Sequence, residues 1–354
     1  MTVEITLAAP PDPAELGAEW TALESRAAAS FFQTWAWTGC RFAERFSHPL
    51  LLRARRAGET VALGLFNRRP RRLAGAVLHL GETGAEPFDA LFIEHNGLLV
   101  ARDHAALLPT LYRAARRSAL GPARGLLPHV LVLPGLDARQ ERAARASGGL
   151  VRQVHTRPAP FVDLTRLRAS RQDFAASLSA NTRQQLGRSN RRYAARGPLA
   201  IARAATPAQA HDWLDALARL HQASWIARGK PGAFAHPFFA RFHHELIDRA
   251  PDAVDLLRVS AADLPIGYLL NFRHRGHVYA YQSGFDYASA DRHQKPGLTC
   301  HAQAIALYAA EGMEVYDFLA GADRYKRSLA NAEAALTWLR LLPGPRELLP
   351  FARA

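Results

Sequence analysis

The most constraining part of the chain is residues 277–326, where strand and helix patterns follow one another without a gap. Residues 277–285 alternate and are rich in aromatic and branched side chains, which predicts a half-buried strand. Apolar residues recur at helical spacing over 298–311, and Gly312 stands where a left-handed helix cap is expected. Residues 313–319 form a short apolar run. The order strand, helix, strand predicts a parallel pair of strands joined by a crossover helix.

The loop that enters this helix carries a spaced motif. Gln294, Gly297 and Thr299 give the pattern Q-x-x-G-x-T, with Arg292 and Lys295 beside it. The first N–H groups of a helix are unpaired and carry partial positive charge, and glycine lets a ligand approach the backbone. These residues therefore suit a pyrophosphate group. A Pro-Gly pair that opens a helix is also an ordinary turn, so the spacing alone fits both interpretations.

The same stretch resembles the C-terminal half of the BioF-like and CelD-like acyltransferases, within the GNAT acetyltransferase superfamily. The residues that carry the resemblance are Tyr279, Tyr281, Gly284, Phe285, Asp286, Pro296, Gly297, Gly312, Asp317, Phe318, Gly321, Tyr325 and Lys326. The resemblance implies an α/β (α+β) protein with a tandem GNAT-like acyl-CoA N-acyltransferase fold, in which helices flank mixed central sheets.

The resemblance also implies a donor. GNAT enzymes bind the pyrophosphate of acetyl-CoA through a Q/R-x-x-G-x-G/A loop, and Gln294, Gly297 and Thr299 fall on its fixed positions. Thr299 replaces the usual final Gly or Ala. Acetyl-CoA or another acyl-CoA is therefore the expected co-substrate, with Arg292 and Lys295 as further donor-binding residues. Related Fem-type peptidyltransferases use aminoacyl-tRNA, which is the alternative donor.

Residues for the chemistry follow from what acyl transfer requires, namely a base for the attacking amine and an acid for the leaving thiolate. Asp317 or Asp286 can act as the base, Tyr325 can act as the acid, and Lys326 can stabilise negative charge. Fem-type enzymes carry a comparable aromatic-Lys pair; a salt bridge to an acidic neighbour is the alternative role for Lys326. The chain has no G-x-S-x-G nucleophile motif, which favours direct transfer.

Five residues are expected to bind the acceptor. Arg188 and Arg192 stand four residues apart on a predicted helix and can hold an anionic group, although a solvated face is the alternative. His221 and Trp225 match an H-x-x-x-W pattern of the family, and the resemblance adds Tyr281. Core packing is the alternative for His221. No H-E-x-x-H or other metal motif is present, so no metal is expected.

The chain has 354 residues, which exceeds one typical core and suits two domains. We predict an N-terminal GNAT-like domain over 1–164, which lacks a phosphate loop of this kind, and a C-terminal acetyltransferase domain over 165–354.

Charge and cysteine content add the setting. The sequence has 45 basic and 31 acidic residues, a net charge of +14, which attracts polyanions, but the arginines are scattered as on a solvated basic surface. Cys40 and Cys300 are too few for a disulfide framework. The N-terminus does not read as a signal peptide, and no apolar run approaches the roughly 18 residues of a membrane span. We expect a cytoplasmic protein.

The predicted function is transfer of an acyl group, in the first place acetyl, to an amine or hydroxyl. The expected acceptor is a small molecule, a sugar, an amino acid or an envelope precursor. One alternative is a Fem-like transferase with tRNA as partner, which the basic charge would suit. A second alternative is a non-catalytic accessory protein of exopolysaccharide synthesis. The sequence specifies neither the acceptor nor an oligomeric state.

Overall fold

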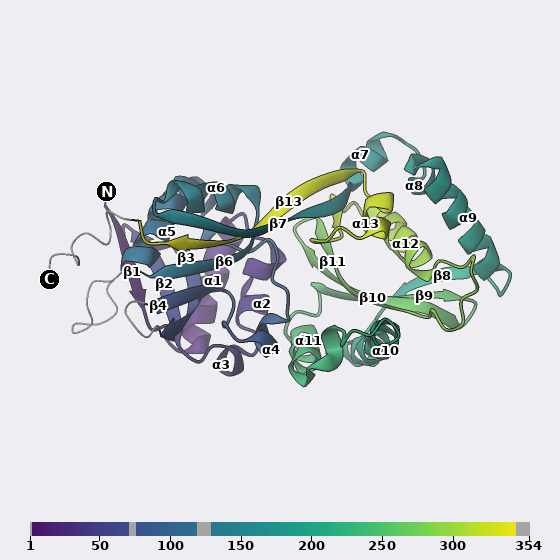
Figure 1. The fold of residues 1–354 in the computed structure, drawn as a ribbon, viewed down its shortest axis with the longest axis horizontal. Coiled ribbons are helices and arrows are strands. Elements are labelled where there is room, and N and C mark those ends of the chain that lie inside the picture. The colour runs from purple at the N-terminus through teal and green to yellow at the C-terminus, as the bar shows by residue number, and fades with distance from the viewer. Residues whose placement is uncertain (1, 71–75, 119–128, 345–354) are drawn as a thin grey trace. The chain divides into compact units, whose positions relative to one another are not determined.

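The structure is a computed structural model that describes residues 2–70, 76–118 and 129–344. The chain forms two compact units (Figure 1): residues up to 157 together with those from 335 onward make the first, and residues 158–334 make the second. The predicted boundary lay between 164 and 165, with the C-terminal segment in the second domain. The structure instead divides the chain at 157, and the C-terminal strand contributes to the first unit.

The first unit is built on a mixed sheet in the order β1-β2-β3-β4-β6-β13. Its strands are β1 (Val3–Ala8), β2 (Pro49–Arg56), β3 (Glu59–Pro70), β4 (Ala76–Leu80), β6 (Val130–Leu136) and β13 (Ala332–Leu342), with the short β5 (Leu99–Val100) beside β3. Neighbouring strands on this path are antiparallel except β4 and β6, which are parallel.

Helices and an aromatic cluster complete this unit. Its helices are α1 (Pro13–Arg26), α2 (Trp35–Thr38), α3 (Phe42–Arg45), α4 (Glu86–Asp89), α5 (Leu108–Arg117) and α6 (Ala138–Ala146), with 3₁₀ turns at Phe31–Gln33 and Arg102–Leu107. The rings of Phe31, Phe32 and Trp37 are buried and meet edge to face. These aromatics therefore serve the core of the first unit.

In the second unit the sheet has the strand order β7-β12-β11-β10-β9-β8. Its strands are the end of β7 (Leu150–Asp163), β8 (Leu199–Arg203), β9 (Val254–Ala261), β10 (Leu264–His274), β11 (His277–Phe285) and β12 (Val315–Asp317). Strands β11 and β12 run parallel, as predicted, and the other neighbours are antiparallel. The mixed sheets with flanking helices confirm the predicted fold class.

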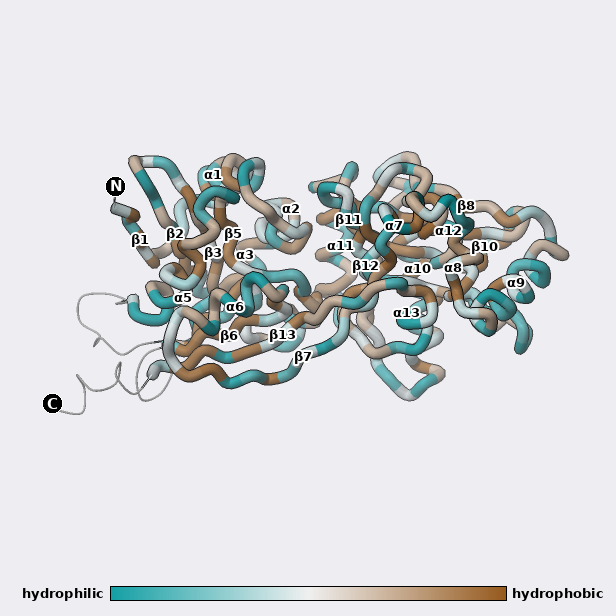
Figure 2. Tube along the Cα trace, turned by 90° about the horizontal axis from the view of Figure 1, so that it is seen from above, coloured by the Kyte–Doolittle hydropathy of each residue, from teal (hydrophilic) through white to brown (hydrophobic). Residues whose placement is uncertain are grey.

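Helices cover both faces of this second sheet (Figure 1). One face carries α7 (Leu164–Ala169), α8 (Phe174–Ser177), α9 (Ala180–Ala194) and α12 (Pro296–Ala310), and the other carries α10 (Pro207–Ile226) and α11 (Pro237–Arg249). The short α13 (Arg324–Leu329) follows β12 and contacts α12. In Figure 2 the strands and α12 are mainly hydrophobic, whereas α9 is largely hydrophilic.

Alternation along β11 divides its side chains between these two helix layers. Val278 and Ala280 belong to the core beneath α12, and Tyr281 stacks on Phe239 of α11. At Gly284 the main chain of α10 comes so close that an added Cβ would lie 2.2 Å from the carbonyl oxygen of Leu217. A larger residue at that position would push α10 away from the strand. No helix in the described part of the chain is long and apolar enough to span a bilayer.

Candidate functional site

Helix α12 is fixed to α9 at its first turn. Ser189 of α9 accepts a hydrogen bond from the N–H of Lys295 at 2.8 Å, and its hydroxyl also lies 2.9 Å from that of Thr299. The Thr299 hydroxyl donates to Asn190 at 3.0 Å. Thr299 is fully buried, so this motif position holds two helices together rather than facing a ligand.

The side chain of Gln294 also points inward. Its Oε1 atom accepts from the N–H of Asp291 at 2.8 Å and from Nη2 of Arg196 at 3.0 Å. Only 4 % of Gln294 is exposed. Gln294 therefore makes a hydrogen bond within the loop between β11 and α12, which fixes the shape of that loop.

Three arginines on α9 or just after it meet this loop. Arg188 lies 3.4 Å from His293, Arg192 lies 3.9 Å from Asp291, and Arg196 donates to the carbonyl oxygen of Ser289 at 3.0 Å. Arg188 and Arg192 are four residues apart and share one side of α9, and Arg196 follows just after the helix ends at Ala194. The structure thus brings Arg188 and Arg192 to the loop, and it adds Arg196, which the same spacing, continued by one turn, would have identified.

The start of α12 remains open to a ligand. Among the described residues, the N–H groups of Gly297 and Leu298 have no hydrogen-bond partner, and Arg292 and Lys295 are exposed beside them. An added Cβ at Gly297 would lie 3.3 Å from the ring of Phe285 and 3.6 Å from the hydroxyl of Tyr287. The backbone N–H groups, and not the side chains of Gln294 and Thr299, are therefore the groups that can meet an anion.

A second group of residues lies where β12 ends. The carboxylate of Asp317 accepts hydrogen bonds from Nε2 of His277 at 3.1 Å and from the N–H of Leu319 at 2.7 Å. Asp317 is 2 % exposed, whereas the side chain of His277 is 27 % exposed. Leu319 has a φ of 62°, in the left-handed region that branched residues rarely occupy. Asp317 therefore orients a histidine and a strained turn together.

Lys326 binds the far side of this turn. Its ammonium group donates to the carbonyl oxygens of Ala320 at 2.9 Å and Leu319 at 3.4 Å. Gly321 has a φ of 144°, a backbone conformation that favours glycine, so the turn needs glycine there. The main chain is thus a partner of Lys326, and the ammonium group positions the turn.

Tyr325 and His301 form an aromatic pair between α13 and α12. Their rings stack with centres 5.4 Å apart, and Nδ1 of His301 lies 2.9 Å from the hydroxyl of Tyr316. Burial, helped by the positive charge of Lys326, lowers the pKa of His301 to about 3. Partial desolvation, helped by the negative charge of Asp323, raises the pKa of Tyr325. Near neutral pH, His301 is therefore uncharged and Tyr325 keeps its proton.

Two of these histidines escaped prediction from sequence. His277 begins a strand and pairs with a carboxylate forty positions away, which no local pattern reveals. His301 stands in the apolar stripe of α12, where the sequence pattern predicts only core packing for a histidine. Its Nε2 atom is nevertheless buried without a partner among the residues that the structure describes. Such an atom marks a position where a polar ligand group can bind.

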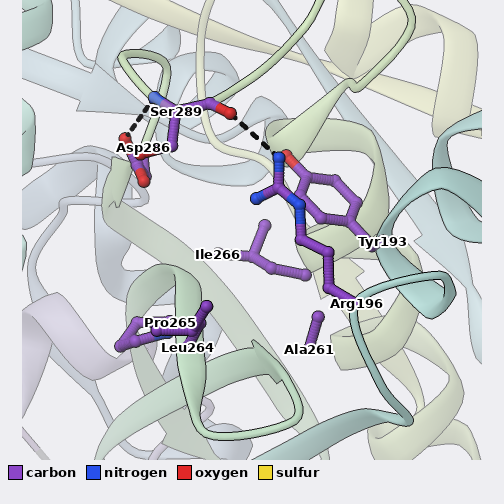
Figure 3. A pocket seen from close by; sticks show the side chains of 8 residues that line it. All are labelled: Tyr193, Arg196, Ala261, Leu264, Pro265, Ile266, Asp286 and Ser289. Carbon is purple, nitrogen blue, oxygen red and sulfur yellow. Dashed lines mark hydrogen bonds between the residues drawn. The ribbon is translucent and has the colours of Figure 1, made fainter.

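Asp286 lies apart from these groups. Its N–H donates to the carbonyl oxygen of Ile266, and its Oδ1 atom accepts from the N–H of Ser289 at 3.0 Å. Figure 3 shows Asp286 and Ser289 on one side of a pocket, with Tyr193 and Arg196 opposite them. The structure therefore associates Asp286 with α9 and β10.

The remaining predicted acceptor residues pack on the other face of the sheet. Nδ1 of His221 donates to the carbonyl oxygen of Ser283 at 3.0 Å, and Nε2 accepts from the N–H of Ala233 at 3.2 Å. Burial lowers the pKa of His221, so the ring is neutral and both nitrogens are engaged. Trp225 packs beside it with ring centres 5.7 Å apart. Tyr281 lies in the aromatic core with Phe239 and Phe272, so these three positions stabilise the fold.

Strands β11 and β12 diverge after a short paired region. They pair over only three positions, from His277 opposite Val315 to Tyr279 opposite Asp317. Strand β11 continues to Phe285 bound to β10 on one side. No strand in the described part of the chain pairs with its other edge beyond Tyr279. That edge leads to the open N-terminus of α12.

A strand, a phosphate-type loop, a crossover helix and a diverging parallel strand define a GNAT-type acyltransferase domain. Residues 180–327 match the family model of the Acetyltransferase (GNAT) domain. The chain therefore carries a GNAT domain in its second unit, which confirms the predicted superfamily.

Solved structures extend the likeness over the whole chain. FemX is 10 % identical with a TM-score of 0.61, and the match covers 98 % of this chain and 99 % of that one. L-PGS from Bacillus licheniformis is 11 % identical with a TM-score of 0.55 and is covered to 98 % in both chains. At such identities the likeness concerns the fold. No curated protein sequence matches the chain.

Proposed function

We propose that this protein is an acyl-CoA-dependent transferase that moves an acyl group, in the first place acetyl, directly to an amine or hydroxyl of a small molecule, sugar or envelope precursor. The parting of β11 and β12 carries this proposal. The free edge of β11 offers N–H and C=O groups to the amide-containing arm of an acyl-CoA, much as a sheet edge accepts an extra strand. That edge ends at the N-terminus of α12, which suits the pyrophosphate.

Side chains near the parted strands can supply the chemistry. His277, oriented by the buried carboxylate of Asp317, is the candidate base for the attacking amine. Tyr325 stays protonated because burial raises its pKa, so it can donate a proton to the leaving thiolate. Lys326 holds the intervening turn and adds positive charge where negative charge develops.

A second donor is favoured by the charge of α9. Arg188 and Arg192 on α9 and Arg196 just beyond its end meet the same loop, in a chain of net charge +14, and such a group of cations attracts a polyanion. An aminoacyl-tRNA would then replace acyl-CoA, with the same base and acid. Both candidates use one site and differ in the donor that carries the acyl group.

Calorimetric titration with acetyl-CoA tests the proposal. We expect binding in the micromolar range, and at least about a tenfold loss in Gly297→Glu, because a carboxylate at the helix N-terminus repels a phosphate. Gly187→Glu is the matched control: it adds the same charge on α9, where a Cβ meets only the end of Arg191 at 3.5 Å. Release of free thiol from acetyl-CoA in the presence of amine acceptors then measures transfer.

The result also separates the alternatives. Binding of uncharged tRNA that weakens steeply with salt, without acetyl-CoA binding, would replace the acyl-CoA donor by aminoacyl-tRNA. Failure of both donors to bind the folded protein would leave a non-catalytic accessory role. Equal loss of acetyl-CoA binding in both glycine variants would show that added charge, and not the helix N-terminus, is responsible.

A further inference from the structure

A pocket of about 170 Å³ lies at the end of the second sheet, beside the loop that leads into α12. It is bounded by the C-terminal end of α9, the hairpin between β9 and β10, and the residues after β11 (Figure 3). Its lining residues are Tyr193, Arg196, Ala261, Leu264, Pro265, Ile266, Asp286 and Ser289. The N–H of Ala262 donates to the carbonyl oxygen of Pro198 at 2.9 Å, which fixes α9 to the hairpin.

The hydroxyl of Tyr193 is the least explained group of this pocket. Tyr193 is 2 % exposed, and its hydroxyl is buried without a hydrogen-bond partner among the described residues. Burial of a hydroxyl without a hydrogen-bond partner is unfavourable, so it indicates a missing partner. Burial raises the pKa of Tyr193, which keeps the proton available for donation. A ligand with a hydrogen-bond acceptor would satisfy it.

Arg196 gives the pocket an anion-binding side. Its Nη2 atom is used by Ser289 and Gln294, which hold the guanidinium group in place at 5.6 Å from the ring centre of Tyr193. The Nε and Nη1 groups have no hydrogen-bond partner among the described residues and remain available to a ligand. Because Gln294 belongs to the loop before α12, Arg196 links this pocket to the proposed pyrophosphate site.

The opposite side of the pocket is formed by the carboxylate of Asp286 and by apolar side chains. One oxygen of Asp286 is held by the N–H of Ser289, and the other has no partner in the described chain. A carboxylate oxygen accepts hydrogen bonds only, so it selects a ligand group that donates, such as an exocyclic amine. The side chains of Leu264, Pro265 and Ile266 form the apolar floor between these polar groups. A flat ring with polar edges fits this distribution.

We propose that this pocket binds the adenine nucleotide end of the donor, with the exocyclic amine on Asp286, a ring nitrogen on the Tyr193 hydroxyl and a phosphate on Arg196. The proposal rests on the proposed function, because a pyrophosphate at α12 places the nucleotide end of the donor at the neighbouring Arg196. Adenosine ends both an acyl-CoA and an aminoacyl-tRNA. A 3′-phosphate is present only on the former.

Titration with nucleotide fragments tests this site without turnover. We expect adenosine 3′,5′-bisphosphate to bind and uridine 3′,5′-bisphosphate, which has no exocyclic amine, to bind at least about tenfold more weakly. Tyr193→Phe should weaken the adenine compound about 3- to 10-fold, and Arg196→Met about 10- to 100-fold, as for neutral and charged hydrogen bonds. Asp286→Asn should reduce the preference for adenine over uracil, because an amide can also donate.

Matched variants serve as controls. Tyr268→Phe removes a hydroxyl on the opposite face of the sheet, where the ring packs against Trp213, and Arg191→Met removes one charge from α9 outside the pocket. Both should bind the adenine compound like the unaltered protein. Equal weakening in Arg191→Met and Arg196→Met would overturn the pocket, since binding would then follow net charge alone.

The fragments also separate the pocket from the proposed function. Adenosine 5′-monophosphate that binds as tightly as the 3′,5′-bisphosphate supports the pocket with a tRNA end as its source, and a clear preference for the bisphosphate supports acyl-CoA. Equal transfer rates with acetyl-CoA and acetyl-phosphopantetheine, unaffected by Tyr193→Phe, would overturn the pocket and leave the acyltransferase intact. Adenine-selective binding without any acyl transfer would support the adenine pocket and contradict the proposed acyltransferase activity.

Discussion

Asp317 and Lys326 bind the two sides of one backbone turn. The carboxylate accepts from the N–H of Leu319 at 2.7 Å, and the ammonium group donates to the carbonyl oxygens of Leu319 and Ala320. Between them, Leu319 keeps a left-handed backbone conformation with a φ of 62°. Strained backbone persists where its surroundings hold it, and it is common at functional sites. This turn follows β12 at the point where that strand leaves β11.

Asp317→Asn is expected to lower kcat/KM by about a hundredfold or more. An asparagine oxygen can still accept from Leu319, but its amide then faces the Nε2–H of His277, so the histidine must change tautomer or turn away. Steady-state kinetics with acetyl-CoA across pH 5–9 would measure the loss and any change in the pH profile. Asp252→Asn, at an exposed position after α11, is the control. Unchanged kinetics in Asp317→Asn would remove the orienting role.

Tyr325→Phe is expected to lower kcat about a hundredfold while KM for acetyl-CoA changes little, because only the proton donor is lost. The phenyl ring can keep its stacking on His301, whose centre lies 5.4 Å away, so the fold should be preserved. Initial-rate measurements and the thermal unfolding midpoint would be compared with those of Tyr268→Phe. A thioester donor with a better leaving-group thiol should recover part of the rate if Tyr325 is the acid.

Prediction from sequence succeeded where the signal is local. The alternation of residues 277–285 and the apolar spacing of 298–311 predict β11 and α12, and the parallel pairing of β11 with β12 follows from their order. The spacing of Gln294, Gly297 and Thr299 also marks the loop that enters α12, which stays the predicted donor loop. The spacing did not predict how the side chains lie. Those of Gln294 and Thr299 face inward, and the backbone of Gly297 remains open to a ligand.

The rest of the site depends on contacts between distant segments. Ser189 meets Thr299 across more than a hundred positions, and His277 meets Asp317 across forty. Neither pair has a spacing that periodicity can detect, because each contact arises only when helices and strands pack. The pocket beside Tyr193 is assembled from a helix end, a hairpin and a loop, so its polar groups converge only in the fold.

Because the carboxyl group of Glu82 is buried, we expect the stability of the first unit to depend on pH. Burial raises its pKa from 4.5 to about 8, and the negative charge of Asp89 adds to this shift, while Arg45 opposes it. The folded state then binds more protons than the unfolded state between these values. Stability is therefore highest at low pH in this window and is lost as pH rises from about 4.5 to about 8.

Glu82→Gln should remove this dependence. Each unit of pKa difference corresponds to about 1.4 kcal/mol, so the rise from 4.5 to about 8 gives a gain of at most about 5 kcal/mol at pH 8. Thermal unfolding midpoints at pH 5, 6, 7 and 8 and constant ionic strength would show it as a flatter profile. Glu86→Gln, at an exposed position at the start of α4, is the control. If the unfolding midpoints of Glu82→Gln and of the unaltered protein changed with pH in the same way, the raised pKa of Glu82 would be contradicted.

Thr299→Val is expected to destabilise the second unit by about 1–2 kcal/mol, although the two side chains have nearly the same shape. The substitution removes the hydrogen bond to Asn190 at 3.0 Å and the contact with Ser189 at 2.9 Å, both in a buried place. Urea unfolding followed by tryptophan fluorescence would measure the change against Thr110→Val, at an exposed position on α5. Because Thr299 ties α12 to α9, the variant should also weaken acetyl-CoA binding. A loss of binding without a loss of stability would instead place the Thr299 hydroxyl on the ligand.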